Sequence, residues 1–481
     1  MNFIHLEFVA FFTVVFISYW QLSRRLQNIG LVIASFVFYG WVHPWFVLLL
    51  LYSATLDYCC GLGMARWPQH KGRLLAVSVV GNVALLGTFK YLDFFILNFV
   101  AASEALGVHA DVHTLGLLLP VGISFFTFQT LSYTIDIYRG QLEPRTNAVD
   151  YLVFVSFFPQ LVAGPIERAK HLLPQIENER TLTFAKLESG LSLALWGAFK
   201  KVVIADTLSP FVGSIFAHPD PSGPMIWAAS LGFSIQLFAD FSAYTDIARG
   251  TARMLGFELV ENFREPFLAR SPSEFWGRWH ISFANWIRDY LFYPLALSKW
   301  CRTWLIIPGI KPTGQFHMMR GMVLALLLSG FWHGASWHFV LWGGLFAVLQ
   351  LAYYFIGRRL PRSVREWPHA DYFLVPLMFF FATLSSLIFR EPNIARIGRY
   401  LTLNPFSATP DEWQVTTVMV TITLATCVPM LAVWQFRKRV PESVVVHPAF
   451  LPVRTTLWCV ASWMLYVFAK PVTSDFVYFQ F

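Results

Sequence analysis

The run Gly321–Met322–Val323–Leu324–Ala325–Leu326–Leu327–Leu328–Ser329–Gly330 carries no charge, and Phe331–Trp332–His333–Gly334 follows it directly. A second apolar run begins at Trp337. Apolar stretches of this kind are typical of helices that cross a lipid bilayer. A titratable imidazole is costly there, so His333 is by default a candidate functional residue. The plainer interpretation is a core histidine that donates a hydrogen bond to a carbonyl.

The composition extends the membrane assignment to the whole chain. Of 481 residues, 56% are hydrophobic and only 13% are charged, whereas soluble domains are about 25% charged. We therefore expect an all-α, polytopic integral membrane protein with about 11–14 helices. No internal repeat is apparent, which favours a single domain over residues 1–481 with a functional core at about 115–345. The expected spans include 28–41, 114–137 and 280–297, with a break at Tyr39–Gly40–Trp41 before Pro44.

The net charge of +8 fits membrane orientation better than nucleic-acid binding, because the basic residues cluster in short loops. These clusters are Arg24–Arg25, Arg66 with Lys71 and Arg73, Arg358–Arg359, and Arg437–Lys438–Arg439. Residues 216–224 are poor in Lys and Arg and are expected on the opposite side. The five cysteines form no C-x-x-C pair, and no P-loop, dinucleotide fingerprint or metal-binding motif is present. ATP hydrolysis, dinucleotide redox chemistry and zinc proteolysis are unsupported.

A second histidine, His280, ends the segment Glu274–Phe275–Trp276–Gly277–Arg278–Trp279–His280, and Asn285, Arg288 and Asp289 follow it. The alternation of charged and aromatic residues predicts an amphipathic helix. A neutral imidazole can act as general base toward a hydroxyl. His333 and His280 are both candidates for that role, and Trp332 and Trp279 directly precede them in the sequence. His338, five residues beyond His333, is expected to be structural.

Three further features carry weaker signals. Asp240, Tyr244 and Asp246 lie in an apolar segment and need partners, for which Arg249, Arg278 and Arg288 are candidates; a bracing ion-pair lattice is favoured over catalysis. Gly164–Pro165 predicts a helix end. The last residues, 476–481, alternate aromatic side chains around Tyr478. They form either an interfacial aromatic belt, or a tail that docks a partner or relays the transferred group through the phenol.

These motifs together resemble the membrane-bound O-acyltransferases, in particular the bacterial polysaccharide branch. The resemblance rests on the segments 274–282, 288–291, 331–334 and 240–246, together with Leu119–Pro120–Val121–Gly122–Ile123–Ser124–Phe125 and Ala163–Gly164–Pro165–Ile166. It implies a ring of helices around a thinned centre with a cytoplasmic funnel, in the bacterial inner membrane. It also implies that His333 is catalytic and that His280 supports it.

The same resemblance implies transfer of an acyl group, acetyl first, from a cytoplasmic thioester to a hydroxyl on a polysaccharide across the membrane. The donor would be acetyl-CoA or an acyl carrier protein, and the partner an extracytoplasmic acyltransferase of the SGNH-hydrolase type. Ala296–Leu297–Ser298–Lys299–Trp300 replaces a common Gly-Gly-Asn run, and Gly277 a larger polar residue. These departures leave D-alanyl transfer from a carrier protein open. A glycan-precursor transporter would need paired broken helices in two halves, which are not apparent; a non-catalytic scaffold is the other alternative.

Overall fold

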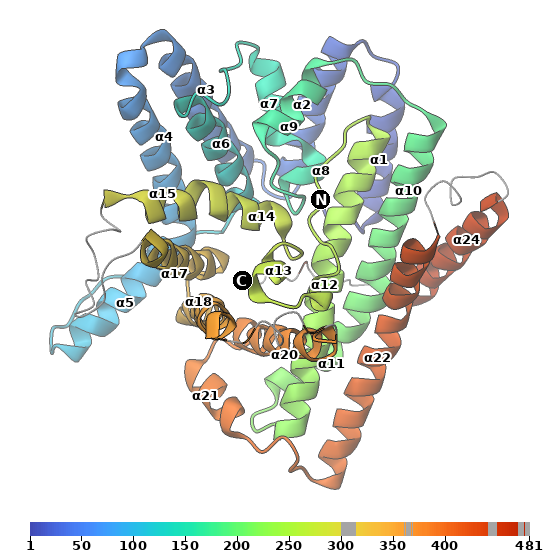
Figure 1. Ribbon diagram of the computed structural model, residues 1–481. Coiled ribbons are helices and arrows are strands. Elements are labelled where there is room, and N and C mark those ends of the chain that lie inside the picture. Colours follow the sequence, from blue (N-terminus) through green and yellow to red (C-terminus); the bar gives the residue numbers. More distant parts are fainter. Residues whose placement is uncertain are drawn as a thin grey trace.

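The computed structural model describes residues 1–299, 314–359, 361, 367, 369–440, 450–469 and 476. Within those residues the chain folds into helices and connecting loops without any strand (Figure 1). The expected all-α class is therefore confirmed. The longer helices are Leu6–Tyr19 (α1), Arg24–Gly40 (α2), Phe46–Arg66 (α3), Lys71–Leu86 (α4), Leu92–Ala105 (α5), Ile123–Tyr138 (α6), Phe184–Phe199 (α10), Asp206–Ala217 (α11), Gly223–Met254 (α12), Gly314–His333 (α17), Trp337–Arg359 (α18), Asp371–Arg390 (α20), Pro410–Arg439 (α22) and Leu451–Phe468 (α24).

Shorter helices join these, and three π-helical segments interrupt them. The short helices are Ala148–Ser156 (α7), Phe158–Leu161 (α8), Ala169–Glu177 (α9), Pro272–Trp276 (α13), Ile281–Trp286 (α14), Tyr293–Leu297 (α15) and Ile394–Thr402 (α21). The π-helical segments are Gly87–Tyr91 (η2), Lys200–Ala205 (η3) and Ile287–Phe292 (η5). Single π-turns inside α-helices are frequent at functional sites because the extra residue redirects a side chain.

Six helical stretches among the described residues are long and apolar enough to cross a bilayer, so the protein is a multi-pass membrane protein. They are Phe46–Arg66, Pro68–Ala105, Gly223–Met254, Trp337–Arg359, Asp371–Arg390 and Pro410–Phe436. The Gly223–Met254 stretch is 83% buried in its most apolar window, whereas Pro410–Phe436 is 17% buried. Helix α12 is therefore buried inside the helix bundle, whereas α22 exposes much of its surface, where lipid would lie.

Helix α10 packs closely along α12, as Figure 1 shows, because both helices carry glycine where they meet. A Cβ atom built on Gly250 would lie 2.5 Å from the Gly190 carbonyl oxygen, and one on Gly197 would lie 2.7 Å from the Ala243 carbonyl oxygen. Neither distance is possible for a larger residue. Small residues of this kind let membrane helices approach one another to backbone contact.

Basic loops gather on one face of the molecule, which we call the basic face: residues 20–25, 66–73, 139–147 and 166–183. Arg24 and Arg145 both bind Glu177, the latter at 2.5 Å between Nε and Oε1. Helix α12 begins on the opposite face, where Gly223 lies against Asn404. The positive-inside rule predicts that the basic face is the cytoplasmic one.

The expected break after α2 is confirmed, since α2 ends at Gly40 and α3 begins at Phe46. Two expected helices are wrong in extent. The span at 114–137 is helical only from Ile123, because Gly122 adopts a left-handed conformation with φ 80°. The segment 274–289 is not one amphipathic helix: α13 ends at Trp276, and His280 adopts φ 44° before α14 begins. Tertiary packing of its aromatic residues overrides the local pattern.

Candidate active site

His333 is the last residue of α17 and is 5% exposed. A tight corner joins α17 to α18, and two glycines allow the helices to pack there. A Cβ atom on Gly330 would lie 2.1 Å from the Phe339 carbonyl oxygen, and one on Gly343 would lie 2.3 Å from that of Leu326. The two glycines therefore let α17 and α18 pack in backbone contact next to His333.

Aromatic rings from three other helices surround the His333 imidazole. The Trp342 ring of α18 lies 4.8 Å from it, edge-on at 79°, and the Phe389 ring of α20 lies 5.4 Å away. Phe283 of α14 lies 5.5 Å from it on another side. The imidazole is thus held in a dry and rigid environment, where an electrostatic interaction is stronger than in water.

Two cavities meet at His333. One, the loop cavity, has a volume of about 90 Å³ and is lined by residues 119–125 and by Lys90, Val162, Trp332 and His333. The other, the aromatic cavity, has a volume of about 30 Å³. Its walls include Phe275, Trp279, Trp342, Phe346, Phe389, Ser385, Ser386 and His333. The predicted site residues Trp332 and Trp279 therefore lie with His333, on different sides of it.

His280 lies beside the same aromatic group but is held differently. Its Nδ1 lies 3.1 Å from Oδ1 of Asn262, which also accepts the Ser282 hydroxyl at 2.9 Å. Its Nε2 has no hydrogen-bond partner among the described residues, although the side chain is buried. The His280 ring lies 5.0 Å from Phe283 and 6.4 Å from Trp332. Sequence reasoning grouped His280 with His333, and the fold brings both imidazoles against the same two rings.

A large cleft opens from the basic side of this centre. Its volume is about 890 Å³, and four cationic side chains and two carboxylates line it: Arg139, Arg168, Lys170 and Arg288 with Asp136 and Asp289. Asn285, Tyr290 and His171 complete much of its wall. We call it the basic cleft. The predicted residues Asn285, Arg288 and Asp289 all lie here rather than beside His333.

Stacked aromatic rings connect the basic cleft with the centre. The Tyr290 ring, on the cleft wall, lies 5.3 Å from Trp286. Trp286 stacks on Phe128 at 3.9 Å, and Phe128 stacks on Trp332 at 5.3 Å. The Trp286 indole also donates to the Phe128 carbonyl at 2.9 Å. These packed rings therefore separate the basic cleft from His333 with apolar side chains.

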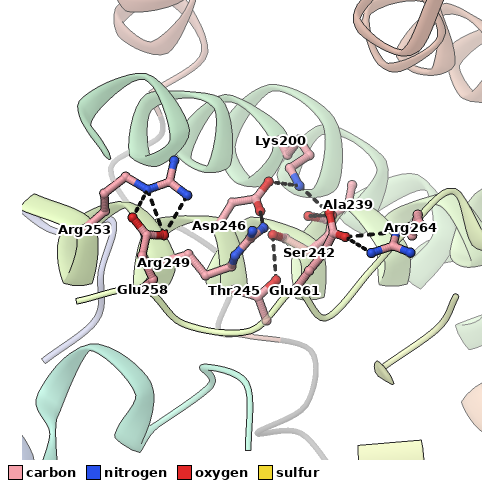
Figure 2. Close-up of polar contacts among 10 residues, drawn as sticks. All are labelled: Lys200, Ala239, Ser242, Thr245, Asp246, Arg249, Arg253, Glu258, Glu261 and Arg264. Atoms are coloured by element: carbon pink, nitrogen blue, oxygen red, sulfur yellow. Dashed lines mark hydrogen bonds and ion pairs between the residues drawn. The ribbon is translucent and has the colours of Figure 1, made fainter. Parts of the chain in front are cut away.

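The acidic residues of α12 form an ion-pair lattice with the π-helical segment η3, as favoured from the sequence. Lys201 Nζ lies 2.9 Å from carboxylate oxygens of both Asp240 and Asp206. Lys200 Nζ lies 2.8 Å from Asp246 and 2.7 Å from the Ser242 hydroxyl (Figure 2). Such a lattice braces η3 against α12.

The partners expected for these carboxylates are mostly wrong. Arg249 does reach Asp246, at 3.6 Å. Arg278 instead pairs with Glu274 at 2.7 Å, and Arg288 pairs with Asp289 at 2.8 Å. The Tyr244 hydroxyl donates to Asn2 at 2.9 Å. These contacts leave Tyr244 and Arg278 outside the immediate surroundings of His333.

Sequence reasoning missed three lysines, namely Lys90, Lys200 and Lys201. All three lie inside apolar runs, and an ionisable residue in such a run is a candidate by the criterion that selected His333. Lys90 is the one beside the centre. Its Nζ lies 2.5 Å from the Trp332 carbonyl oxygen and 3.1 Å from that of His333.

Phe476, the one described residue beyond Ala469, lies inside the molecule. Phe476 is 1% exposed, and its ring lies 4.3 Å from Tyr244 and 5.5 Å from Phe241, which contacts His280. For Phe476 the interfacial-belt interpretation is wrong. Tyr478, the expected relay or docking residue, lies outside the described residues.

Residues 141–388 match the MBOAT, membrane-bound O-acyltransferase family. A protein named "Probable alginate O-acetylase" from Azotobacter vinelandii is 39% identical over 70% of this chain; the match spans 65% of that relative, slightly less than two thirds of its length.

Two other relatives differ in the acceptor or acyl group that their names give. A "Peptidoglycan O-acetyltransferase" from Helicobacter pylori is 32% identical over 80% of this chain and 76% of its own length. A "Teichoic acid D-alanyltransferase" from Bacillus subtilis is 29% identical over 50% of this chain and 60% of its own. The O-acetyl-transferring relatives match more of the chain at higher identity.

Proposed function

Because this chain belongs to the membrane-bound O-acyltransferase family, we propose that it transfers an acetyl group from a cytoplasmic thioester to a polysaccharide hydroxyl across the bacterial inner membrane. The observation that carries the proposal is the position of His333. Its buried imidazole borders the loop cavity and the aromatic cavity at once, so two substrates can meet at one ring.

His333 acts as the general base. The neutral imidazole takes the proton of the acceptor hydroxyl while that oxygen attacks the thioester carbonyl carbon. The tetrahedral intermediate then collapses, the carbon–sulfur bond breaks, and the imidazolium returns its proton to the departing thiolate. General-base catalysis typically contributes about 10²–10⁴-fold. His280, held by Asn262, and the indoles of Trp279 and Trp332 are the donors nearest to a developing oxyanion.

The thioester donor binds at the basic cleft. Acetyl-CoA and the phosphopantetheine arm of an acyl carrier protein both carry phosphate, which arginine side chains bind through charge-assisted hydrogen bonds. Four cations against two carboxylates leave the cleft positive. The packed rings of Tyr290, Trp286 and Trp332 lie between the cleft and His333, so the thioester arm reaches the imidazole only when these rings move apart. An uncharged arm suits such an apolar passage better than the phosphates do.

The aromatic cavity supports acetyl as the transferred group. The cavity, with a volume of about 30 Å³ beside Trp342, Phe346 and Phe389, is small and so favours a short acyl group over a long chain. A D-alanyl group would also bring an ammonium into a cavity that has no carboxylate among its lining residues, where an unpaired charge is costly. The cavity therefore suits the acetyl group named for the alginate and peptidoglycan relatives better than the D-alanyl group named for the teichoic acid relative.

The acceptor hydroxyl reaches His333 through the loop cavity. Residues 106–122 connect α5 and α6 on the face opposite the basic face, and residues 119–122 line this cavity. The acceptor is a cell-surface or secreted polysaccharide, reached directly or through an extracytoplasmic acyltransferase of the SGNH-hydrolase type. Burial of Phe476 beside Tyr244 supports a role for the tail, with Tyr478 as relay or docking residue.

The test is acyl transfer by the purified protein in lipid nanodiscs. We expect wild-type protein with radiolabelled acetyl-CoA to release CoA and to label an oligosaccharide acceptor. His333→Ala should reduce the transfer by at least about 100-fold, within the range for loss of a general base. A second arm replaces acetyl-CoA by acetyl or D-alanyl carrier protein and so identifies the donor.

His338→Ala is the matched control, because His338 is also buried but hydrogen-bonds Ser336 at 2.8 Å rather than lining either cavity. It should retain most of the activity. A folded His333→Ala protein with full transfer activity would refute the proposed mechanism. Lack of thioester turnover by the wild type with every donor, in the presence of the acceptor, would instead favour a transporter or a scaffold.

A further inference from the structure

Lys90 is an ionisable residue that the proposed mechanism does not use. Its side chain nevertheless contacts the backbone of His333, the proposed general base. It lies within the apolar stretch Pro68–Ala105, in the π-helical segment η2 between α4 and α5. Placing an ammonium group in such a stretch is costly, so the position calls for a compensating interaction. The hydrogen bonds of the ammonium group provide this compensation.

The Lys90 ammonium binds the end of the helix that carries His333. Its Nζ donates to the carbonyl oxygens of Trp332, at 2.5 Å, and of His333, at 3.1 Å. The last carbonyls of a helix lack intrahelical donors, and the C-terminal end of the helix dipole attracts a cation. Nζ also lies 5.4 Å from the centre of the Trp332 ring, a cation–π distance.

Residues that follow Lys90 in the same helical stretch contact Phe331 and Trp337, which flank the corner between α17 and α18. The Tyr91 ring stacks on Phe331 at 4.6 Å, and the Phe94 ring packs against Phe331 at 5.5 Å. Asn98 accepts a hydrogen bond from the Trp337 indole at 2.9 Å. Residues 90–98 therefore contact both ends of the corner between α17 and α18. Among them, Lys90 contacts His333 directly.

We propose that Lys90 is a positioning residue that fixes the end of α17, and with it the orientation of the His333 imidazole and the Trp332 indole. This rests on the proposed role of His333. Lys90 also lines the loop cavity together with both residues. Without the ammonium group, two carbonyls at the end of α17 would lose their donor, and the last turn of the helix could shift or fray.

The decisive experiment compares Lys90→Met, Lys90→Arg and Lys71→Met in the nanodisc assay. Methionine keeps the apolar length but removes the donor. We expect Lys90→Met to lower kcat at least tenfold, while KM for the thioester changes less than threefold, because misplacement by about 1 Å costs on the order of 100-fold in rate. Lys90→Arg, which retains charge and donors, should recover most of kcat.

Lys71→Met is the matched control, since Lys71 begins α4, far along the same helical stretch from the centre. Its kcat should equal that of the wild type. Hydrogen exchange adds a readout that general destabilisation would not produce. In Lys90→Met the amides of residues 330–337 should exchange faster, while those of α12 remain as protected as in the wild type.

Unchanged kcat in Lys90→Met, or a loss confined to KM, would overturn the inference. Should Lys90→Met fail to fold, Lys90→Leu, which also removes the donor, replaces it and is judged by the same criteria. The outcomes remain separate from those for the proposed function. Full activity of His333→Ala refutes the role of His333, whereas an inactive His333→Ala beside a fully active Lys90→Met refutes only the positioning role of Lys90.

Discussion

Trp342 forms part of the wall of the aromatic cavity, and its ring packs edge-on against His333. Trp342→Ala removes that wall, so we expect transfer of propionyl and butyryl groups to rise at least fivefold relative to acetyl. One methylene in an apolar pocket is worth about 10–200-fold in discrimination. The measurement is competition between acyl-CoA donors, with mass spectrometry of the product.

Trp227→Ala is the control for this prediction, since Trp227 stacks on Phe380 at 5.6 Å and does not line the cavity. It should leave the donor preference unchanged. An unaltered preference in folded Trp342→Ala would mean that another element limits the acyl group.

His171 provides a pH-dependent contact on the basic face, in the short helix α9. Its Nδ1 lies 2.7 Å from the buried Glu167 carboxylate, and that hydrogen bond raises the pKa of His171 above its usual value near 6.5. A group whose pKa is raised in the folded state stabilises it at low pH. The contribution is complete below the unfolded pKa and is lost as pH rises through the folded pKa.

We therefore expect His171→Ala to lower the melting temperature more at pH 5.5 than at pH 8.5. The difference should be small, because the His171 side chain is 42% exposed and solvent weakens the pair. Thermal melts of both proteins at the two pH values test this. A larger loss at pH 8.5 than at pH 5.5 would contradict the sign of the linkage.

The start of helix α6 depends on a single glycine. Gly122 has φ 80°, and a Cβ atom there would lie 2.6 Å from the Leu161 carbonyl oxygen. Gly122→Ala should therefore combine backbone strain of about 1–2 kcal/mol with a steric clash. Since Gly122 lines the loop cavity, acyl transfer should fall at least tenfold together with the melting temperature.

Gly116→Ala separates the two costs, because Gly116 also has a positive φ, 57°, but nothing lies within 4 Å of a Cβ there. This variant should show the strain alone and keep most of the activity. Equal loss of activity in the two variants would argue that loop conformation, and not contact with Leu161, shapes the cavity.

The elements show what the sequence could and could not predict. Apolar runs and low charge sufficed for the membrane class, whereas the role that the tryptophan–histidine–glycine motif gives His333 stays a prediction. The π-helical segments η2 and η3 could not be foreseen, because no local pattern marks an extra residue in a turn. Segment η2 carries Lys90 and η3 carries Lys201. Lys201 is the partner of Asp240, for which only arginines had been considered.

At the scale of the whole molecule, the prediction concerns which face meets the cytoplasm. The basic cleft opens among Arg139, Arg168, Lys170 and Arg288, near the loops of the basic face, and the positive-inside rule assigns that face to the cytoplasm. A donor made in the cytoplasm can bind there only if this orientation is correct. Single cysteines in a background with all five native cysteines replaced by serine test it.

In intact spheroplasts, a membrane-impermeant maleimide should label Phe406→Cys, on the face opposite the basic face, where Phe406 is 83% exposed. It should not label His70→Cys, in the loop between α3 and α4, until the membrane is opened by detergent. Inside-out vesicles serve as the control and should reverse the pattern. Labelling of His70→Cys in intact spheroplasts would place the basic cleft outside, where no cytoplasmic thioester could bind in it.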